Sequence, residues 1–230
     1  MDILIGEYYA KHRENLHNLF INVEKNIQGR ICHSSIILLK ILCELEKIEN
    51  YLEIGVHNGG SMGLLITNNN SKNLYGIDLF EDMYDVNKHL NKDKFVKYQY
   101  FKRDNLSKKK TADNLTLLMN KYNKKINLNL IQGNSYFDKT ENEFNKVRNN
   151  ITLDLLFIDG DHTLDGVKND FERYNKYVKK GGFIIFDDYH HEIIQRYCDD
   201  LFLNNSSYEL ICKFKSYNSN AIDLLVKKIS

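Results

Sequence analysis

Residues 153–190 read LDLLFIDGDHTLDGVKNDFERYNKYVKKGGFIIFDDYH, and this stretch decides the fold. Two apolar runs within it, LDLLFI and FIIF, are typical of buried strands. Between them, apolar side chains recur at helical spacing, at Val167, Phe171, Tyr174 and Val178. This spacing predicts a helix, which Gly181 and Gly182 would close. Strand, helix and strand in this order form a βαβ unit, whose crossover makes the two strands parallel.

Each of the two strands ends directly in acidic residues. Asp159 and Asp161 follow the first strand, and Asp187 and Asp188 follow the second. The carboxyl ends of parallel strands open on one edge of the sheet, where open α/β sheets bind ligands, so these acids are expected to converge there. Carboxylates gathered in one cleft repel one another, and one must hold a proton unless a cation lies among them. The pattern therefore predicts a metal site or an acid–base role.

The composition is that of a single globular α/β domain spanning residues 1–230. The chain has 230 residues, of which 42% are hydrophobic, and this is enough for a substantial core. Lys and Arg number 32 and Asp and Glu number 31, which gives a formal net charge of +1. Because this balance offers no attraction to nucleic acid or to an anionic membrane, neither is expected as a partner. A homo-oligomer is left open.

Cysteine usage and the N-terminal sequence both indicate a cytoplasmic protein. The cysteines lack zinc-like or redox spacing and are interpreted as reduced, buried thiols: Cys32, Cys43, Cys198 and Cys212. The first residues become charged too early for a signal peptide. The apolar run at 36–42 is too short to span a membrane, and Lys40 interrupts it.

The first 50 residues are predicted to be helical. One apolar stripe is formed by Leu16, Leu19, Phe20 and Val23. A second helix is predicted to begin at Ser34 or Ser35 and to run through Ile48.

Three further strands are predicted before the βαβ unit, and a hairpin after it. The strands lie at Tyr51–Ile54, in NLYGIDLF with its end at Asp78, and in INLNLIQGNS, which ends in a turn containing Asn134 and Ser135. The hairpin consists of two strand-like runs that meet around residues 216–220.

Residues 81–125 form a polar, Lys-rich insertion with a predicted helix at Leu115–Tyr122. Long insertions in α/β domains often serve as binding loops. We therefore expect residues 81–110 and the N-terminal helices to act as a substrate lid, in which Lys108, Lys109 and Lys110 could meet substrate phosphates.

A glycine-containing turn follows the strand that ends at Ile54. Glu53, Gly55 and Gly59 let the backbone turn sharply and approach a ligand, and Ser61 is predicted to cap the next helix. The turn is not the G-x-G-x-x-G of dinucleotide folds, because His57 stands where a second glycine is expected. Asp78, at the end of the next strand, could accept hydrogen bonds from both ribose hydroxyls of an adenosine-containing ligand.

Together these motifs resemble the class I S-adenosylmethionine-dependent methyltransferases. More narrowly, IDGDH and GGFIIFDDYH resemble the magnesium-dependent sugar O-methyltransferases of the macrocin and novobiocin type. The resemblance covers residues 34–230. It implies a Rossmann-like, doubly wound sheet of seven mostly parallel strands whose last strand is antiparallel, as the C-terminal hairpin suggests.

The resemblance also implies roles for individual residues. The expected S-adenosylmethionine site comprises Glu53, Gly55, Gly59, Ser61, Asp78, Asn134, Ser135 and Asp159. In it, Gly55 and Gly59 line the methionine part, Asp78 holds the ribose, and the turn at Asn134 and Ser135 flanks the adenine. The expected divalent cation site comprises Asp159, Asp187 and Asp188. Relatives place the general base at the position of either Asp161 or His162, and this chain has both.

This set of residues fits methyl transfer to a hydroxyl. A hydroxyl is a poor nucleophile near neutral pH, and a bound cation with a nearby Asp or His makes its proton easier to remove. Oxygen ligands without cysteine favour Mg²⁺, with Mn²⁺ as an alternative. His190 and His191 are interpreted as residues of the cleft wall or of a solvated loop.

Four alternatives are weighed against a sugar acceptor. A catechol- or phenol-type small-molecule O-methyltransferase would use a similar acidic site, and a non-catalytic S-adenosylmethionine-binding protein would share the fold. A nucleotide-cofactor oxidoreductase is disfavoured by the missing G-x-G-x-x-G and by the hairpin. Nucleic-acid methylation is disfavoured because the chain has no proline for an N-P-P-Y motif and no evident basic face.

Overall fold

The computed structural model describes residues 1–27, 34–80, 107–216 and 220–230. Seven strands of the described residues form one sheet in the order β3-β2-β1-β4-β5-β7-β6. The strands are β1 (Asn50–Ile54), β2 (Asn73–Asp78), β3 (Asn127–Gln132), β4 (Leu153–Ile158), β5 (Val178–Phe186), β6 (Tyr208–Phe214) and β7 (Asp223–Lys228). Strands β1 to β5 are parallel to one another, and β7 is antiparallel to both β5 and β6. The predicted fold class is confirmed, including the antiparallel last strand.

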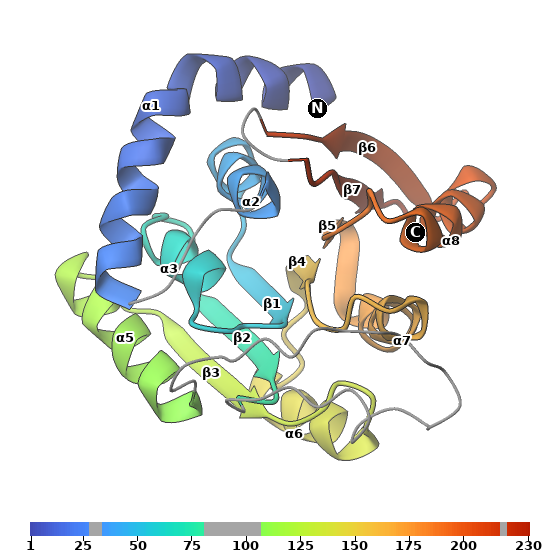
Figure 1. Cartoon of the computed structure of the whole chain (residues 1–230). Helices are drawn as coiled ribbons and strands as arrows, with labels where there is room; N and C mark the ends of the chain where they lie inside the picture. The colour runs from blue at the N-terminus through green and yellow to red at the C-terminus, as the bar shows by residue number, and fades with distance from the viewer. Residues whose placement is uncertain (28–33, 81–106, 217–219) are drawn as a thin grey trace.

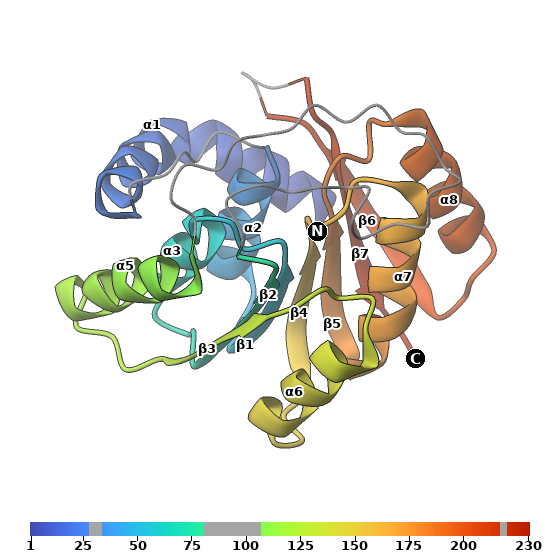
Figure 2. The same cartoon turned by 60° about the horizontal axis from the view of Figure 1, so that its bottom comes forward.

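Helices cover both faces of the sheet (Figures 1 and 2). The helices are α1 (Asp2–Ile27), α2 (Ser34–Leu45), α3 (Gly60–Ile66), α5 (Lys108–Lys121), α6 (Asp138–Arg148), α7 (Leu164–Tyr174) and α8 (Glu192–Leu203), with a short 3-10 helix, η1 (Asn175–Tyr177). Helix α1 lies along the outer side of α2, α3 and α5 in one layer (Figure 1), whereas α6, α7 and α8 form the other layer (Figure 2).

Strand β4 shows why the apolar runs become central strands. All six of its residues are buried, because alternate side chains enter two different cores. Leu155 and Phe157 belong to the core beneath α1, α2 and α3, whereas Leu156 and Ile158 belong to the core beneath α6, α7 and α8. A strand covered on both faces needs an almost continuous apolar run, and LDLLFI supplies one that only Asp154 interrupts. The Oδ2 atom of Asp154 accepts from the backbone N–H groups of Glu49 and Asn50 at 2.9 and 2.7 Å.

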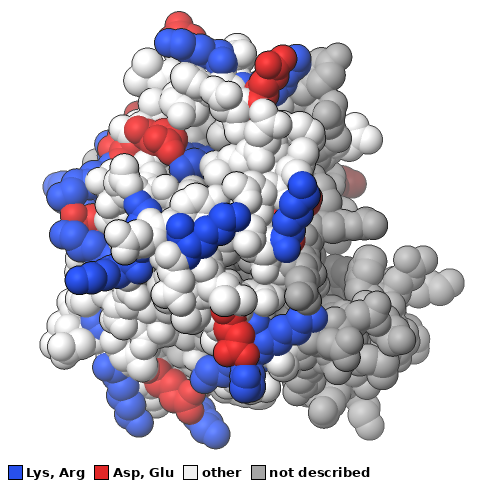
Figure 3. All heavy atoms as spheres, turned by 90° about the vertical axis from the view of Figure 1, so that its left-hand side faces the viewer, with Lys and Arg blue, Asp and Glu red and all other residues white. Residues whose placement is uncertain are grey.

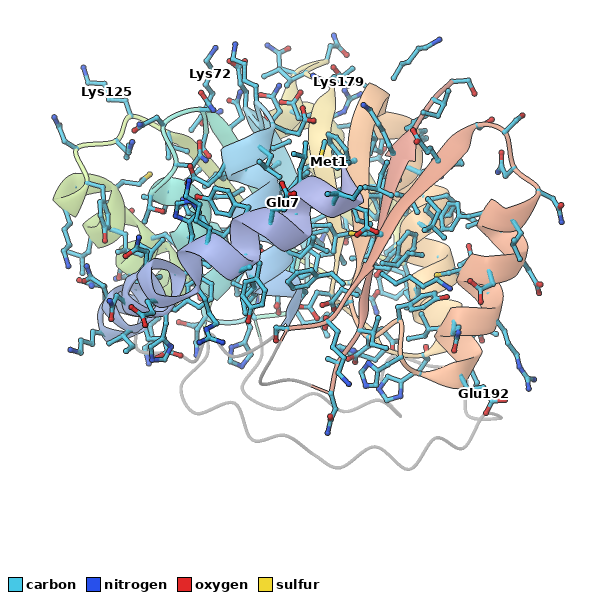
Figure 4. The ribbon with its side chains drawn as sticks, turned by 90° about the horizontal axis from the view of Figure 1, so that it is seen from above. Met1, Glu7, Lys72, Lys125, Lys179 and Glu192 are labelled. Atoms are coloured by element: carbon cyan, nitrogen blue, oxygen red, sulfur yellow. The ribbon has the colours of Figure 1, made fainter. Side chains whose placement is uncertain are left out.

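The amino ends and the carboxyl ends of the parallel strands lie at two opposite edges of the sheet. Figure 4 shows Lys72, Lys125 and Lys179, which precede or open strands, at one edge, and Glu192, the first residue of α8, at the opposite edge. The edge near Glu192 is where the parallel strands end. The predicted site residues therefore belong to one edge of the sheet.

The end of α7 differs from the prediction. The helix ends at Tyr174, where the Asn175 side-chain Nδ2 donates to the Phe171 carbonyl at 2.7 Å, and η1 follows. Val178 is therefore the first residue of β5 and not the last of the helical stripe. Gly181, with φ of +79°, lies inside β5, where the register with β4 shifts. The glycine pair thus shapes an irregular strand and does not close a helix.

Two other helix boundaries also differ. Helix α2 ends at Leu45 and not at Ile48, and Asn68 Nδ2 donates to one of its last carbonyls, that of Cys43. Helix α5 begins at Lys108, two turns before the predicted start, because the Ser107 side chain caps it by accepting from the backbone N–H of Lys110 at 3.2 Å.

Several other expectations can be compared with the structure. Leu16, Phe20 and Val23 of α1 are buried, as predicted. Cys43, Cys198 and Cys212 are free and buried, which confirms the thiol prediction for them, whereas Cys32 lies outside the described residues. Of the proposed lid segment at 81–110, residues 81–106 also lie outside them. Within the described parts of the chain, the search for a helix long and apolar enough to cross a membrane found none.

Candidate active site

Acidic side chains from three adjacent strands meet at the carboxyl edge of the sheet. Glu53 belongs to β1, Asp159 follows β4 and Asp187 follows β5. Backbone hydrogen bonds continue past the strand ends, from Asp159 N to Ile54 O at 2.9 Å and from Asp187 N to Ile158 O at 3.0 Å. Because side chains alternate along an extended chain, these three acids project to the same side of the sheet.

Asp159 and Asp187 form the centre of this group. Burial raises the pKa of Asp159 well above its usual range, and the charge of Asp187 and a hydrogen bond between the two carboxyl groups raise it further. In the absence of a cation, this environment disfavours the state in which both carboxyl groups are ionised. A divalent cation would relieve this repulsion, so the donor set fits such an ion.

His162 lies between two of the carboxylates. Its Nε2 is 3.7 Å from Asp159 Oδ1, and its Nδ1 forms a hydrogen bond with Asp188 Oδ2. Burial lowers the pKa of His162, but the hydrogen bond and charge of Asp188, together with the charge of Asp187, outweigh it and raise the pKa overall. One ring nitrogen thus faces the acid pair, and the other is fixed by Asp188.

Asp161 occupies a different place. Its Oδ1 accepts a hydrogen bond from the Thr163 backbone N–H at 3.0 Å, and Thr163 caps α7 by accepting from the Gly166 N–H at 3.0 Å. A Cβ atom at Gly166 would lie 2.6 Å from the Cβ of Asp161, so the residue packs tightly against the first turn of α7. The two candidate bases are adjacent in sequence, but only His162 contacts Asp159 and Asp188 in the hydrogen bonds and ion pairs described above.

Asp188 directly follows Asp187, at the start of the turn after β5. Its backbone has φ of +55°, and its carboxylate bonds to His162. The structure therefore groups the ligand atoms of Asp159, His162 and Asp187, and separately those of Asp188, His190 and His191.

The glycine turn after β1 packs against the loop that carries the acids. Gly55 has φ of +94°, and a Cβ atom there would lie 1.9 Å from the Asp159 carbonyl oxygen, so only glycine fits. Gly59, with φ of +82°, takes the N-cap position of α3. The prediction that Ser61 caps this helix is wrong, because its hydroxyl donates to the buried Glu53 carboxyl group instead.

Asp78 is held in a fixed orientation at the end of β2. Its Oδ2 accepts from the backbone N–H of His57 at 2.8 Å, and its Oδ1 accepts from that of Phe80 at 2.7 Å. A carboxylate oxygen has two lone pairs and can accept more than one hydrogen bond. These bonds tie the glycine turn to the end of β2.

The turn after β3 is bound to α7. Asn134 Oδ1 accepts from the Tyr136 backbone N–H at 2.9 Å, and the Ser135 carbonyl accepts from the Tyr174 hydroxyl at 3.2 Å. Asp170 of α7 is completely buried beside this turn, and Ser135 partly offsets the rise in its pKa that burial causes. The sequence analysis did not single out Asp170. Its position within the Val167–Tyr174 stripe, on the apolar side of the helix, was the available signal.

Comparison with known proteins identifies the family. Residues 52–189 match the family described as "Methyltransferase domain". The chain belongs to this family. An uncharacterized protein, R132, of Acanthamoeba polyphaga mimivirus is 35% identical to this chain over 169 residues, which cover 73% of this chain and 64% of that protein. The match thus spans less than two thirds of the relative's length.

Solved structures with the same fold differ in acceptor. An O-methyltransferase from Bacillus cereus in complex with SAH is 15% identical, with a TM-score of 0.58 over 92% of this chain and 91% of that one. CalS11, a calicheamicin methyltransferase, is 14% identical, with a TM-score of 0.57 over 90% and 91%. An rRNA methylase from Streptococcus thermophilus is 11% identical, with a TM-score of 0.53 over 88% and 100%. At these identities the likeness shows the fold alone.

Lys108, Lys109 and Lys110, the lysines of the proposed lid, lie in the first turn of α5. Thr111 on this helix donates to the His57 carbonyl at 3.1 Å, so α5 begins beside the glycine turn. Lys109 is paired with Asp113 at 2.6 Å. On the face seen in Figure 3, Lys and Arg side chains are spread over the surface with Asp and Glu among them.

The stability of the methyltransferase domain is expected to fall as the pH rises from about 5 to 8. Burial raises the pKa of Glu53 to about 8 and that of Asp170 to about 7. Between the ordinary carboxyl pKa and these values, the folded state keeps protons that the unfolded state has lost, so rising pH favours unfolding. Thermal unfolding followed by circular dichroism in EDTA should show this slope.

Glu53→Gln and Asp170→Asn should each flatten the dependence of melting temperature on pH, because an amide cannot ionise. Glu172→Gln, which changes an exposed acid on α7, is the control and should keep the parent slope. Equal slopes in the parent and in both buried variants would contradict the prediction.

Proposed function

We propose that the protein is an S-adenosylmethionine-dependent O-methyltransferase that uses a divalent cation to methylate a hydroxyl of a sugar, either a nucleotide sugar or a glycan. The observation that carries this proposal is the contact of His162 with Asp159, because ligand atoms of these two residues and of Asp187 lie within 4.8 Å of one another. A proton acceptor beside a cation-binding acid pair is what hydroxyl activation requires.

The acid pair supports a cation such as Mg²⁺ or Mn²⁺. Asp159 and Asp187 offer carboxylate oxygens, and no cysteine of the described residues is near them in a metal-binding group. When bound, a divalent cation would lower the pKa of a coordinated hydroxyl. Asp188, the third acid expected from the sequence, is proposed to act beside the cation by fixing His162 through Nδ1.

His162 is proposed as the general base in place of Asp161. Its Nε2 faces Asp159, while the hydrogen bond from Nδ1 to Asp188 fixes the ring orientation and the tautomer, as a carboxylate does for a catalytic imidazole in other enzymes. The Oδ1 atom of Asp161 is already bonded at the start of α7.

The same edge of the sheet supports S-adenosylmethionine as the methyl donor. Gly55 and Gly59 bring the backbone close to the acids, and Asp78 presents an oriented carboxylate at the next strand end. The turn at Asn134 and Ser135 follows β3, which pairs with β2. These positions are those expected for the methionine, ribose and adenine parts of the cofactor.

The acceptor can be identified by a direct assay. The protein is incubated with labelled S-adenosylmethionine and Mg²⁺ and with nucleotide sugars, free glycans or catechols. Label transferred to a sugar hydroxyl supports the proposal, and label transferred to catechols alone would assign the phenolic alternative. Cofactor binding with no transfer to any acceptor class would favour a non-catalytic binding protein.

Asp78→Ala is expected to weaken S-adenosylmethionine binding by about 1.5 to 3 kcal/mol, or roughly 10- to 100-fold, because charge-assisted hydrogen bonds to the ribose are lost. Isothermal titration calorimetry measures the effect. Asp78→Asn keeps the side-chain size and one acceptor, so it should bind with intermediate affinity.

The Asp78 variants also need a check on folding. Alanine removes the acceptor of the His57 and Phe80 backbone N–H groups, so circular dichroism must show that the domain remains folded. Glu172→Ala, a change far from this turn on the exposed side of α7, serves as the control. Parent-like affinity in a folded Asp78→Ala protein would place the cofactor elsewhere.

A further inference from the structure

Three imidazoles surround the carboxylate of Asp188. His162 bonds to Oδ2 from the loop after β4. From the turn after β5, His190 Nδ1 lies 3.7 Å from Oδ1 and His191 Nε2 lies 3.6 Å from Oδ2. Of the eight histidines in the chain, three therefore gather at one acid from two separate loops.

The local backbone produces this arrangement. Asp188 adopts φ of +55°, and the His191 backbone N–H donates to the Asp188 carbonyl at 2.9 Å, which closes a turn. The turn folds both histidines back over the Asp188 side chain, and their rings lie 4.3 Å apart. His190 Nδ1 also accepts a weak hydrogen bond from the Ile222 N–H at 3.4 Å, which a metal ion bound at the same nitrogen would displace.

We propose that Asp188, His190 and His191 form a second metal site, which takes a borderline transition-metal ion of the Zn²⁺, Co²⁺ or Ni²⁺ class. One ligand atom of each residue lies within 4.8 Å of the other two. Ligand atoms in a tetrahedral site with bonds of about 2.0 to 2.1 Å are about 3.3 Å apart. Small rotations of the two exposed imidazoles would bring the ligand atoms from their present separation to that of a tetrahedral site. A fourth position then stays open for water.

The donor chemistry separates this site from the acid pair. Two imidazole nitrogens and one carboxylate oxygen favour borderline metals, whereas Asp159 and Asp187 offer oxygen alone and favour Mg²⁺ or Mn²⁺. His162 remains hydrogen-bonded to Asp188 and orients it, which is a common role for a partner just outside a metal's ligands.

Cobalt binding tests the proposal without any acceptor or methyl donor. Untagged protein is saturated with Mg²⁺ at pH 8, so that the acid pair is filled and the imidazoles are available, and is then titrated with Co²⁺. We expect one equivalent of Co²⁺ to bind with the visible absorption of a low-coordinate, nitrogen-ligated ion. The double variant His190→Ala/His191→Ala should bind it at least about 10-fold more weakly.

Matched variants decide where the ion binds. Both histidines are at the surface, and circular dichroism should show that the double variant folds like the parent. His191→Ala alone should weaken binding in the same direction, and His17→Ala, which removes an exposed histidine of α1, should bind Co²⁺ like the parent. Parent-like binding by the double variant, or loss of binding in Asp187→Asn, would overturn the proposal. Because the readout is spectroscopic, failure of methyl transfer does not affect it.

Discussion

Asp187→Asn is expected to lower the rate of methyl transfer by roughly 100- to 1,000-fold, the equivalent of about 3 to 4 kcal/mol of lost transition-state stabilisation. The carboxyl group of Asp187 hydrogen-bonds to that of Asp159, and together they supply the proposed cation ligands. An amide in this place weakens the site for a divalent cation. Excess EDTA should have the same effect on the parent protein, and Mg²⁺ should reverse it.

Folding and activity should respond differently to this substitution. In the absence of a cation, the two neighbouring carboxylates repel one another, and an amide removes that electrostatic cost. The metal-free Asp187→Asn protein should therefore melt at the parent temperature or above it in EDTA. Asp138→Asn, which changes an exposed acid in the first turn of α6, is the control and should keep full activity. Full activity of the parent in excess EDTA would end the metal mechanism.

His162→Ala is expected to reduce kcat by about 100- to 10,000-fold, which is the usual contribution of a general base. The affinity for S-adenosylmethionine should stay close to that of the parent, because His162 faces the acids and not Asp78. Single-turnover transfer of label measures the chemical step, and calorimetry measures the cofactor affinity.

Two neighbouring variants test the assignment of the base. Asp188→Asn should keep the imidazole but lose its fixed orientation, so a smaller loss of kcat is expected than for His162→Ala. Asp161→Asn can still accept the Thr163 N–H and should retain most of the activity. A larger loss in Asp161→Asn than in His162→Ala would assign the base to Asp161 instead.

The sequence by itself determined the row of strands and the place of the site. Three patterns are local, because each depends on residues that are near one another in the chain. They are the apolar runs, the helical spacing between these runs and the acids directly after each run. Parallel pairing then follows from the crossover, so the acids after β4 and β5 had to reach one edge. Val178 was predicted in the helix but lies in a strand, which shows the limit of this reasoning. An apolar residue at that spacing fits either element.

Only the tertiary structure decided which of the acids meet. Asp159 and Asp161 are alike in sequence context, yet Asp159 contacts Asp187 while Asp161 binds at the start of α7. Ser61 has the chemistry of a helix cap, but α3 packs its first turn against β1, so its hydroxyl reaches Glu53. Such contacts join loops and helices that follow different strands. They depend on strand register and on single backbone angles such as the left-handed φ of Asp188, which the periodic patterns of the sequence do not give.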